Sequence, residues 1–150
     1  MKYRGLIVTV VLMSLLTVCA TAFGYTKNSI SEVVLIPNSA QSAELGIITI
    51  QEDDAYPTDL YDNDIFIVKL PAGVCFDQSK TSVEGAEYEF ITSTRMEITI
   101  KNTTQSADEI KISPVIDILP GAVPGDVIAK IDARDSGVTA CDMLIAKILP

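Results

Sequence analysis

Residues 96–101 read Met-Glu-Ile-Thr-Ile-Lys, so apolar and polar side chains alternate without a break along this stretch. Successive side chains of an extended strand point to opposite faces, so this pattern puts one face on a core and the other in water. The same period of two recurs in residues 48–50, 65–70, 110–112, 127–131 and 144–148. No window of about 12 residues beyond residue 22 has a convincing helical period. The pattern predicts an all-β protein.

Turn signals separate these runs at short spacing, among them Pro71-Ala72-Gly73, Asn102-Thr103 and Pro120-Gly121. Short strands joined by such turns are typical of a β-sandwich, here of about seven to nine strands. Pro114 lies inside a strand-like stretch, where it predicts an edge position or a bulge because proline cannot donate a ladder hydrogen bond.

Residues 1–22 have the layout of a secretory signal peptide. A basic start is followed by an apolar run of 13 residues from Leu6 to Val18, and then by the small-residue triplet Ala20-Thr21-Ala22. We expect a signal helix that is cleaved before Phe23. The apolar run is short for a bilayer span, so we expect no membrane segment after cleavage and a secreted or cell-surface protein.

Other interpretations of this segment stay open. The run is alternatively kept as a membrane anchor. Residues 16–19 resemble a bacterial lipoprotein box in which Cys19 is lipidated, although Val18 stands where that box has Gly, Ala or Ser. A further alternative is that the chain is the front part of a longer surface protein.

The remaining chain divides into a leading segment, residues 23–42, and a sandwich domain, residues 43–150. The leading segment holds one apolar stretch, Val33–Ile36, which we expect to form a strand of its own sheet or of a neighbour's sheet.

The protein is strongly acidic. It has 11 basic and 20 acidic residues, and loss of Lys2 and Arg4 with the signal peptide changes the formal charge from −9 to −11. Such a surface repels phosphate backbones, so nucleic acid is excluded as a partner.

The chain contains no histidine. This removes the Ser-His-Asp and Cys-His catalytic arrangements and most zinc and copper sites. No phosphate-binding glycine loop or nucleophile elbow is present, and no pair of carboxylates is singled out by its spacing. We therefore expect no enzyme and no resident cofactor.

Cys75 and Cys141 are the two cysteines left after cleavage. In an exported protein an even number predicts a disulfide, here across neighbouring strands. The alternative is that both are small buried apolar residues.

Residues 52–64 form the densest group of carboxylates. Calcium takes six to eight oxygen ligands, so a calcium site is one interpretation, and a solvated acidic turn is the other. The candidate ligands are Asp53, Asp54, Asp59, Asp62 and Asp64.

Four aromatic residues offer a sugar-stacking face, with packing in or around the core as the alternative. They are Tyr56, Tyr61, Tyr88 and Phe90.

Residues 43–148 resemble a β-sandwich domain of secreted bacterial surface proteins, which often carry it beside a copper-amine-oxidase-N-terminal-like domain. The resemblance rests on Gly46–Glu52, Asp64–Val74, Ala122–Val127 and Leu144–Ile148. It implies an immunoglobulin-like or cohesin-like sandwich at the cell surface, and it implies no catalytic residue and no copper site.

Together these features predict a surface module, structural or adhesive, that acts through contacts with other surface proteins or with itself. A small glycan-binding module of the same fold is the alternative.

Overall fold

The structure is a computed structural model that describes residues 26–55 and 57–150, and the predicted signal helix lies outside these residues. The described chain forms β-strands and no helix, so it contains no helix that could cross a membrane. Its 13 strands exceed the seven to nine expected. They are β1 (Thr26–Ile30), β2 (Val34–Ile36), β3 (Ala43–Glu44), β4 (Ile48–Glu52), β5 (Ile65–Lys69), β6 (Val74–Phe76), β7 (Ser82–Glu84), β8 (Ala86–Thr92), β9 (Arg95–Ile100), β10 (Glu109–Ser113), β11 (Val115–Ile118), β12 (Gly125–Asp132) and β13 (Cys141–Ile148).

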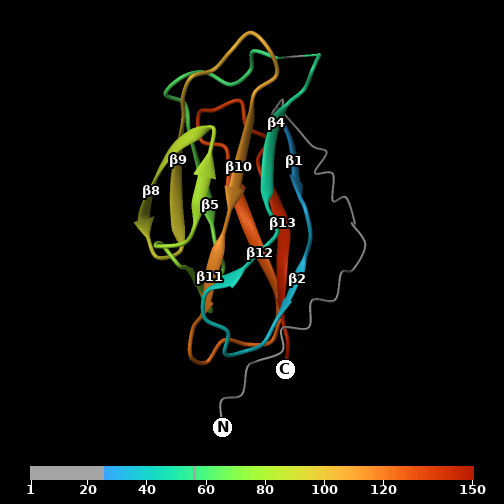
Figure 1. Cartoon of the computed structure of the whole chain (residues 1–150), viewed down its shortest axis with the longest axis vertical. Coiled ribbons are helices and arrows are strands. Elements are labelled where there is room, and N and C mark those ends of the chain that lie inside the picture. Colours follow the sequence, from blue (N-terminus) through green and yellow to red (C-terminus); the bar gives the residue numbers. More distant parts are fainter. Residues whose placement is uncertain (1–25, 56) are drawn as a thin grey trace.

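The strands form a two-layer sandwich (Figure 1). One layer is a six-stranded sheet with the order β2-β13-β12-β5-β9-β8. The other layer combines the sheets β1-β4-β10-β7 and β3-β11-β6. The two sheets are continuous because β10 runs directly into β11, and these two strands form one row through the layer. Every pairing is antiparallel except that of β2 with β13. The predicted all-β sandwich is therefore confirmed.

The core lies between the two layers and is filled by the apolar positions of the alternating runs. In one layer Ile48 pairs with Ile112, and in the other Phe66 pairs with Ile98; all four side chains are buried. The polar residues between them face outward, as the period of two requires. Burial of these large side chains is the main source of the stability of the fold.

The leading segment contains two strands rather than the one expected. β1 pairs with β4 in one layer and β2 pairs with β13 in the other, so the segment forms one edge of both sheets. The apolar stretch at Val33–Ile36 does form a strand, β2, and it joins its own sheet. Gly46 fits closely against this segment, because a Cβ atom there would lie 2.2 Å from the carbonyl oxygen of Glu32.

Pro114 separates β10 from β11, so of the two expected positions, an edge or a bulge, the edge is wrong. The row is interior, with β3 and β4 on one side and β6 and β7 on the other. The regular ladder breaks here, and the side-chain oxygen of Thr81 accepts a hydrogen bond from the amide of Val115 at 3.0 Å.

Candidate functional site

The six-stranded sheet ends at β8, which pairs only with β9 and leaves its other edge without a partner strand among the described residues. β8 is seven residues long and mostly exposed. Tyr88 is 39% exposed and Ile91 is 46% exposed on this strand. The register shifts between Phe90 and Thr92, so the regular part of the edge covers Ala86–Phe90.

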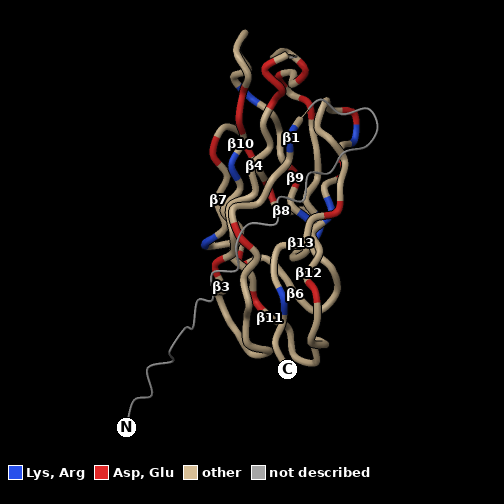
Figure 2. The backbone as a smooth tube through the Cα atoms, turned by 90° about the vertical axis from the view of Figure 1, so that its right-hand side faces the viewer, with Lys and Arg blue, Asp and Glu red and all other residues tan. Residues whose placement is uncertain are grey.

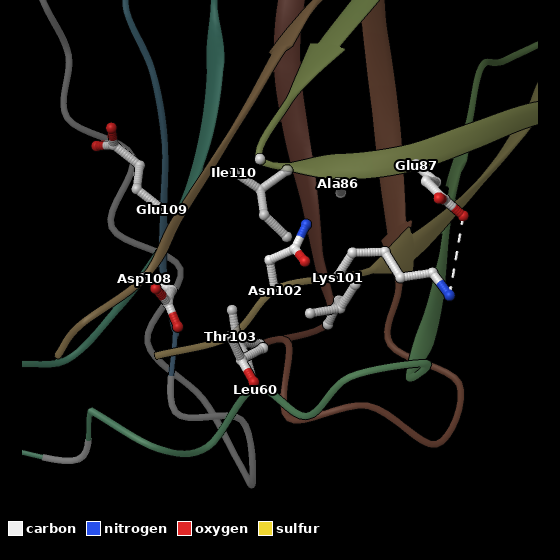
Figure 3. Close-up of a pocket in the computed structure, with 11 residues that line it drawn as sticks. Leu60, Ala86, Glu87, Lys101, Asn102, Thr103, Asp108, Glu109 and Ile110 are labelled. Atoms are coloured by element: carbon white, nitrogen blue, oxygen red, sulfur yellow. Dashed lines mark ion pairs between the residues drawn. The ribbon is translucent and has the colours of Figure 1, made fainter. Parts of the chain in front are cut away.

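A cavity of about 350 Å³ opens at the start of β8 (Figure 3). It arises because the chain leaves β7 at Gly85 and crosses to the other layer. Gly85 has φ +82°, and a Cβ atom there would lie 2.6 Å from the carbonyl oxygen of Glu109, so only glycine allows this crossing. Beyond this point no strand of the described residues pairs with the beginning of β10 on that side.

The cavity has an apolar part and a polar part. Leu60, Ala86, Ile100 and Ile110 supply the apolar side chains, and Asn102 and Thr103 lie among the polar lining residues. Carboxylates predominate among the charged residues that line it, which are Glu87, Asp108, Glu109 and Lys101.

Lys101 is held at this site by two partners. Its Nζ donates to Oδ1 of Asn63 at 2.7 Å and lies 3.8 Å from Oε2 of Glu87 (Figure 3). On β10, Oε1 of Glu109 lies 2.8 Å from Nζ of Lys111, and this contact raises the pKa of Lys111. The site therefore combines an exposed strand edge with a partly apolar, net acidic hollow at one end of it.

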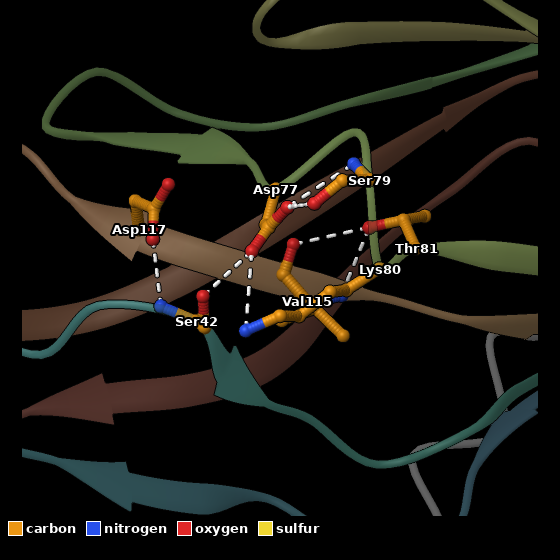
Figure 4. A network of polar contacts seen from close by, with 7 residues as sticks. All are labelled: Ser42, Asp77, Ser79, Lys80, Thr81, Val115 and Asp117. Carbon is orange, nitrogen blue, oxygen red and sulfur yellow. Dashed lines mark hydrogen bonds and ion pairs between the residues drawn. The ribbon is translucent and has the colours of Figure 1, made fainter.

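A second polar cluster lies on the outer side of β6 and β11 (Figure 4). The hydroxyl of Ser42 donates to Asp77 at 2.6 Å, and the amide of Ser42 donates to Asp117 at 2.6 Å. Hydrogen bonds from Ser42 and Ser79 lower the pKa of Asp77.

Cys75 lies beside this cluster, opposite Asp117 in the register. Burial, followed by the charges of Asp117 and Asp77, raises the pKa of its thiol. A nucleophilic cysteine needs the opposite shift, so this arrangement does not activate Cys75 for catalysis.

The structure forms no disulfide between Cys75 and Cys141, contrary to the expected pairing. The reason is topological: β6 and β13 belong to different layers and are not neighbours. Cys75 lies between the buried residues of β6 and faces outward. Cys141 packs against the core, and its Sγ accepts a hydrogen bond from Nδ2 of Asn28 at 3.4 Å.

The acidic loop between β4 and β5 lies at the end of the sandwich away from the C terminus, where Figure 2 marks a group of Asp and Glu positions on the backbone. Asp53 forms an ion pair with Lys27 at 3.2 Å and accepts from the amide of Ala55; these contacts lower its pKa. Asp62 accepts from the amide of Thr103 at 2.9 Å. Asp54 is exposed.

Two further carboxyls of this end have raised pKa values. Burial, and then the charge of Glu52, raises the pKa of Asp59; burial, and then Asp135, raises that of Asp64. Glu52 itself is only 2% exposed and accepts from the amides of Leu60 and Asp108, at 2.6 and 2.8 Å.

Within residues 26–55 and 57–150 no three carboxylates or thiols are grouped so as to hold a metal ion. The acidic residues predicted as calcium ligands are instead spread along a loop that is bonded to its neighbours. The calcium site stays a prediction of the sequence, without geometric support.

The predicted aromatic face is divided. Phe90 packs against Phe76 with ring centroids 5.5 Å apart, and Tyr88 meets Phe90 edge to face at 5.9 Å. Tyr61 lies in the acidic loop and is 62% exposed, while Tyr56 lies outside the described residues. Packing at the core rim, the alternative interpretation, describes Phe90 and Tyr88 better than a flat sugar-binding platform.

The sequence interpretation did not single out β8 or its cavity. A signal was present, because Ala86, Tyr88 and Phe90 alternate with Glu87 and Glu89. That β8 is an outer strand, and that β10 begins beside it, depends on the strand order, which periodicity does not contain.

No protein-family model matches the chain, and no curated protein matches it. Solved structures do. The chain is similar to BcpA, the major pilin subunit of Bacillus cereus, with 14% identity and a TM-score of 0.51, over 83% of this chain and 39% of the pilin. It therefore spans well under half the length of that protein.

Two adhesin domains are similar at a lower level. ACE19, the collagen-binding subdomain of the Enterococcus faecalis surface protein ACE, has 4% identity and a TM-score of 0.43, with 87% of this chain and all of that chain covered. The collagen-binding domain of a Staphylococcus aureus adhesin has 7% identity and a TM-score of 0.46, with 87% and 99% covered. The fold is an immunoglobulin-like β-sandwich. None of these structures bears on a copper-amine-oxidase-like domain.

Proposed function

We propose that the chain is a structural or adhesive module of the cell surface or extracellular space, and that it acts by pairing the edge of β8 with an extended strand of a partner protein. The observation that supports this most directly is the exposed edge of β8, which ends the six-stranded sheet. An extended segment can add to such an edge through main-chain hydrogen bonds, while side-chain pockets provide specificity.

The charges of the site select the partner. Glu87 and Glu89 are exposed on β8, and Glu109 lines the cavity beside it. Acidic side chains on an edge oppose pairing with another acidic strand. A partner strand with Lys or Arg fits, because its aliphatic stem can lie on the apolar lining while its charged end meets the carboxylates.

The location follows from the N-terminal segment. The signal-like layout of residues 1–22 supports export, and the excess of acidic residues suits a protein that stays dissolved outside the cell.

The test is direct binding of fluorescent extended peptides to the protein that begins at Phe23, measured by anisotropy. Peptides that alternate apolar residues with Lys should bind more tightly than the same peptides with Glu. Ile91→Lys adds a positive charge next to the regular part of the edge and should weaken binding of the Lys peptides. Ile128→Lys is the matched control, because Ile128 is 44% exposed but lies on β12, an interior strand.

Charge reversal provides the specificity test. The double variant Glu87→Lys with Glu89→Lys should prefer the Glu peptides over the Lys peptides. If the Ile91→Lys and Ile128→Lys variants bind equally well, or if reversal leaves the preference unchanged, β8 is not the contact surface.

A further inference from the structure

The end of the sandwich opposite the acidic loops carries no charged residue in its loops. Four segments meet there: residues 36–41, 70–74, 118–125 and 148–150. Hydrogen bonds join them, from the amide of Ile118 to Ala40, from that of Leu119 to Gly73 and from that of Leu149 to Ile36. Figure 1 shows these loops beside the C terminus, at one end of the long axis. They are called the uncharged end below.

Exposed apolar side chains are concentrated at the uncharged end. Val123 is 81% exposed at the tip of the loop between β11 and β12, and Leu119 and Leu149 are also exposed. Three exposed apolar side chains at one end of a protein with 20 acidic residues point to an interaction site there.

Beside Val123 the uncharged end is hollowed. A cavity of about 450 Å³ lies between the turn at residues 38–41 and residues 118–120, and the outward-facing side chains of Cys75 and Asp117 also line it. The loop that forms one wall of this cavity continues directly to Val123. The end therefore presents a projecting apolar side chain next to a hollow that is large enough to receive one.

We propose that the uncharged end binds a second copy of this chain, with Val123 of each copy inserted in the hollow of the other. A projection and a hollow on the same surface are self-complementary, as a two-fold contact between identical chains requires. Sixteen of the 22 residues in the four segments are not buried, so the contact is smaller than the roughly 20–30 residues per side of a standard interface, and a weak, concentration-dependent dimer is expected.

The charge distribution supports this arrangement over a head-to-tail one. The loops 53–64, 101–108 and 132–140 at the far end carry eight acidic and two basic residues. Contact between two uncharged ends places these acidic loops as far apart as the molecule allows. A head-to-tail contact would instead place the apolar end against loops with eight carboxylates, whereas the hollow has one, that of Asp117, which already accepts a hydrogen bond from the amide of Ser42.

This inference rests on the proposed function, that the chain acts through protein contacts, but it uses a different surface. The test is sedimentation equilibrium of the protein that begins at Phe23 over a range of concentrations. A dimer is expected that strengthens when salt is raised from about 0.05 to 0.5 M, because salt screens the repulsion between two acidic copies.

Two variants address the contact. Val123→Glu puts a charge on the projection, and Ser39→Trp fills the hollow from an exposed turn; each should weaken the dimer by at least about tenfold. Ile128→Glu is the control, an exposed apolar residue on β12 outside the four segments, and should leave dimerisation within about twofold. Melting temperatures establish that each variant is folded.

Three results would overturn the proposal: a monomer at every concentration, a dimer insensitive to both variants, or equal weakening by Ile128→Glu. Adsorption of a monomeric protein to phosphatidylcholine vesicles through Val123 would likewise assign this end to a lipid surface instead. Ile91→Lys lies on β8 and not at the uncharged end. Loss of peptide binding at β8 and loss of the dimer at the uncharged end can therefore be measured separately.

Discussion

Nδ2 of Asn28, on β1, donates a hydrogen bond of 2.6 Å to the carbonyl oxygen of Thr139, 111 residues further along the chain. This bond joins the edge strand of one sheet to the loop that precedes β13 of the other. Thr26 adds to it, because its hydroxyl oxygen accepts from the amide of Thr139 at 2.9 Å and its carbonyl accepts from the Thr139 hydroxyl at 2.7 Å. All three residues are buried, so the two layers are held together here by polar contacts that water does not replace.

Replacement of Asn28 should therefore destabilise the whole sandwich. Asn28→Leu leaves the buried Thr139 carbonyl without this donor, at a cost of about 1–3 kcal/mol in the free energy of unfolding. Urea denaturation measures the change. Lys27→Leu, on the same strand with an exposed side chain, should change the free energy by about 0.5 kcal/mol or less. Equal effects of the two variants would mean that the hydrogen bond from Asn28 to Thr139 does not contribute to stability.

Removal of the leading segment should abolish cooperative folding. A chain that begins at Ser39 lacks β1 and β2, which form an edge of each sheet, and it loses the buried residue Ile36. Without them the core and the edges of β4 and β13 are exposed to water. Circular dichroism and thermal melting, with the chain that begins at Phe23 as the reference, measure the result. A shortened chain with an unchanged melting temperature would show that the segment is a passive linker.

Asp59, whose side chain is partly buried, should make stability depend on pH. Burial and the charge of Glu52 raise its pKa above the ordinary 3.8, and its Oδ2 is buried without a hydrogen-bond partner. A folded-state pKa above the unfolded value stabilises the fold at low pH, and this contribution is lost as the pH rises through the folded pKa. Asp59→Asn, which stays neutral, should be more stable than the wild type near pH 7.

The advantage of Asp59→Asn should vanish below about pH 3.8, where the wild-type carboxyl is protonated in both states. Urea unfolding at a series of pH values measures this. Asp54→Asn, an exposed residue of the same loop, is the control. A gain that is the same at every pH would mean that titration of Asp59 is not its cause.

The thiol of Cys75 should react slowly with alkylating reagents in the folded protein. Its pKa is raised by burial, then by Asp117 and Asp77, so less thiolate is present at a given pH. Asp117→Asn removes one of these charges and should shift the pH profile of alkylation to lower pH. Mass spectrometry of the peptide that contains Cys75 follows the rate. Asp126→Asn, on the other sheet, should leave the profile unchanged; a shift of the same size there would exclude a local effect of Asp117.

Strands with clean alternation were predictable from the sequence, and strands without it were not. Residues 96–100 and 127–131 lie in β9 and β12, as expected. β1 was missed because Thr-Lys-Asn-Ser-Ile has no apolar alternation. Its buried positions are Thr26 and Asn28, and they are satisfied by hydrogen bonds to Thr139 rather than by apolar contacts.

Each predicted site required particular side chains to lie close together in space. Which side chains do so depends on the order of the strands in the sheets. Cys75 and Cys141 each lie in a strand, as expected, but the two strands belong to different layers. The acidic residues of the loop after β4 are close in the sequence, yet Asp53 forms an ion pair with Lys27 and Asp62 accepts a hydrogen bond from the amide of Thr103. A loop can direct neighbouring carboxylates to different partners, so closeness along the chain does not make a metal site.

The sequence by itself determined the all-β class, because a period of two leaves each strand one apolar face that only a second sheet can cover. It also determined the uncharged and acidic loops, since charge is a property of each residue. Only the tertiary structure decided that these loops lie at opposite ends, that β8 is an outer strand and that the leading segment closes both sheets. Those facts follow from which strands pair, and pairing is settled by the packing of the whole core rather than by any one segment.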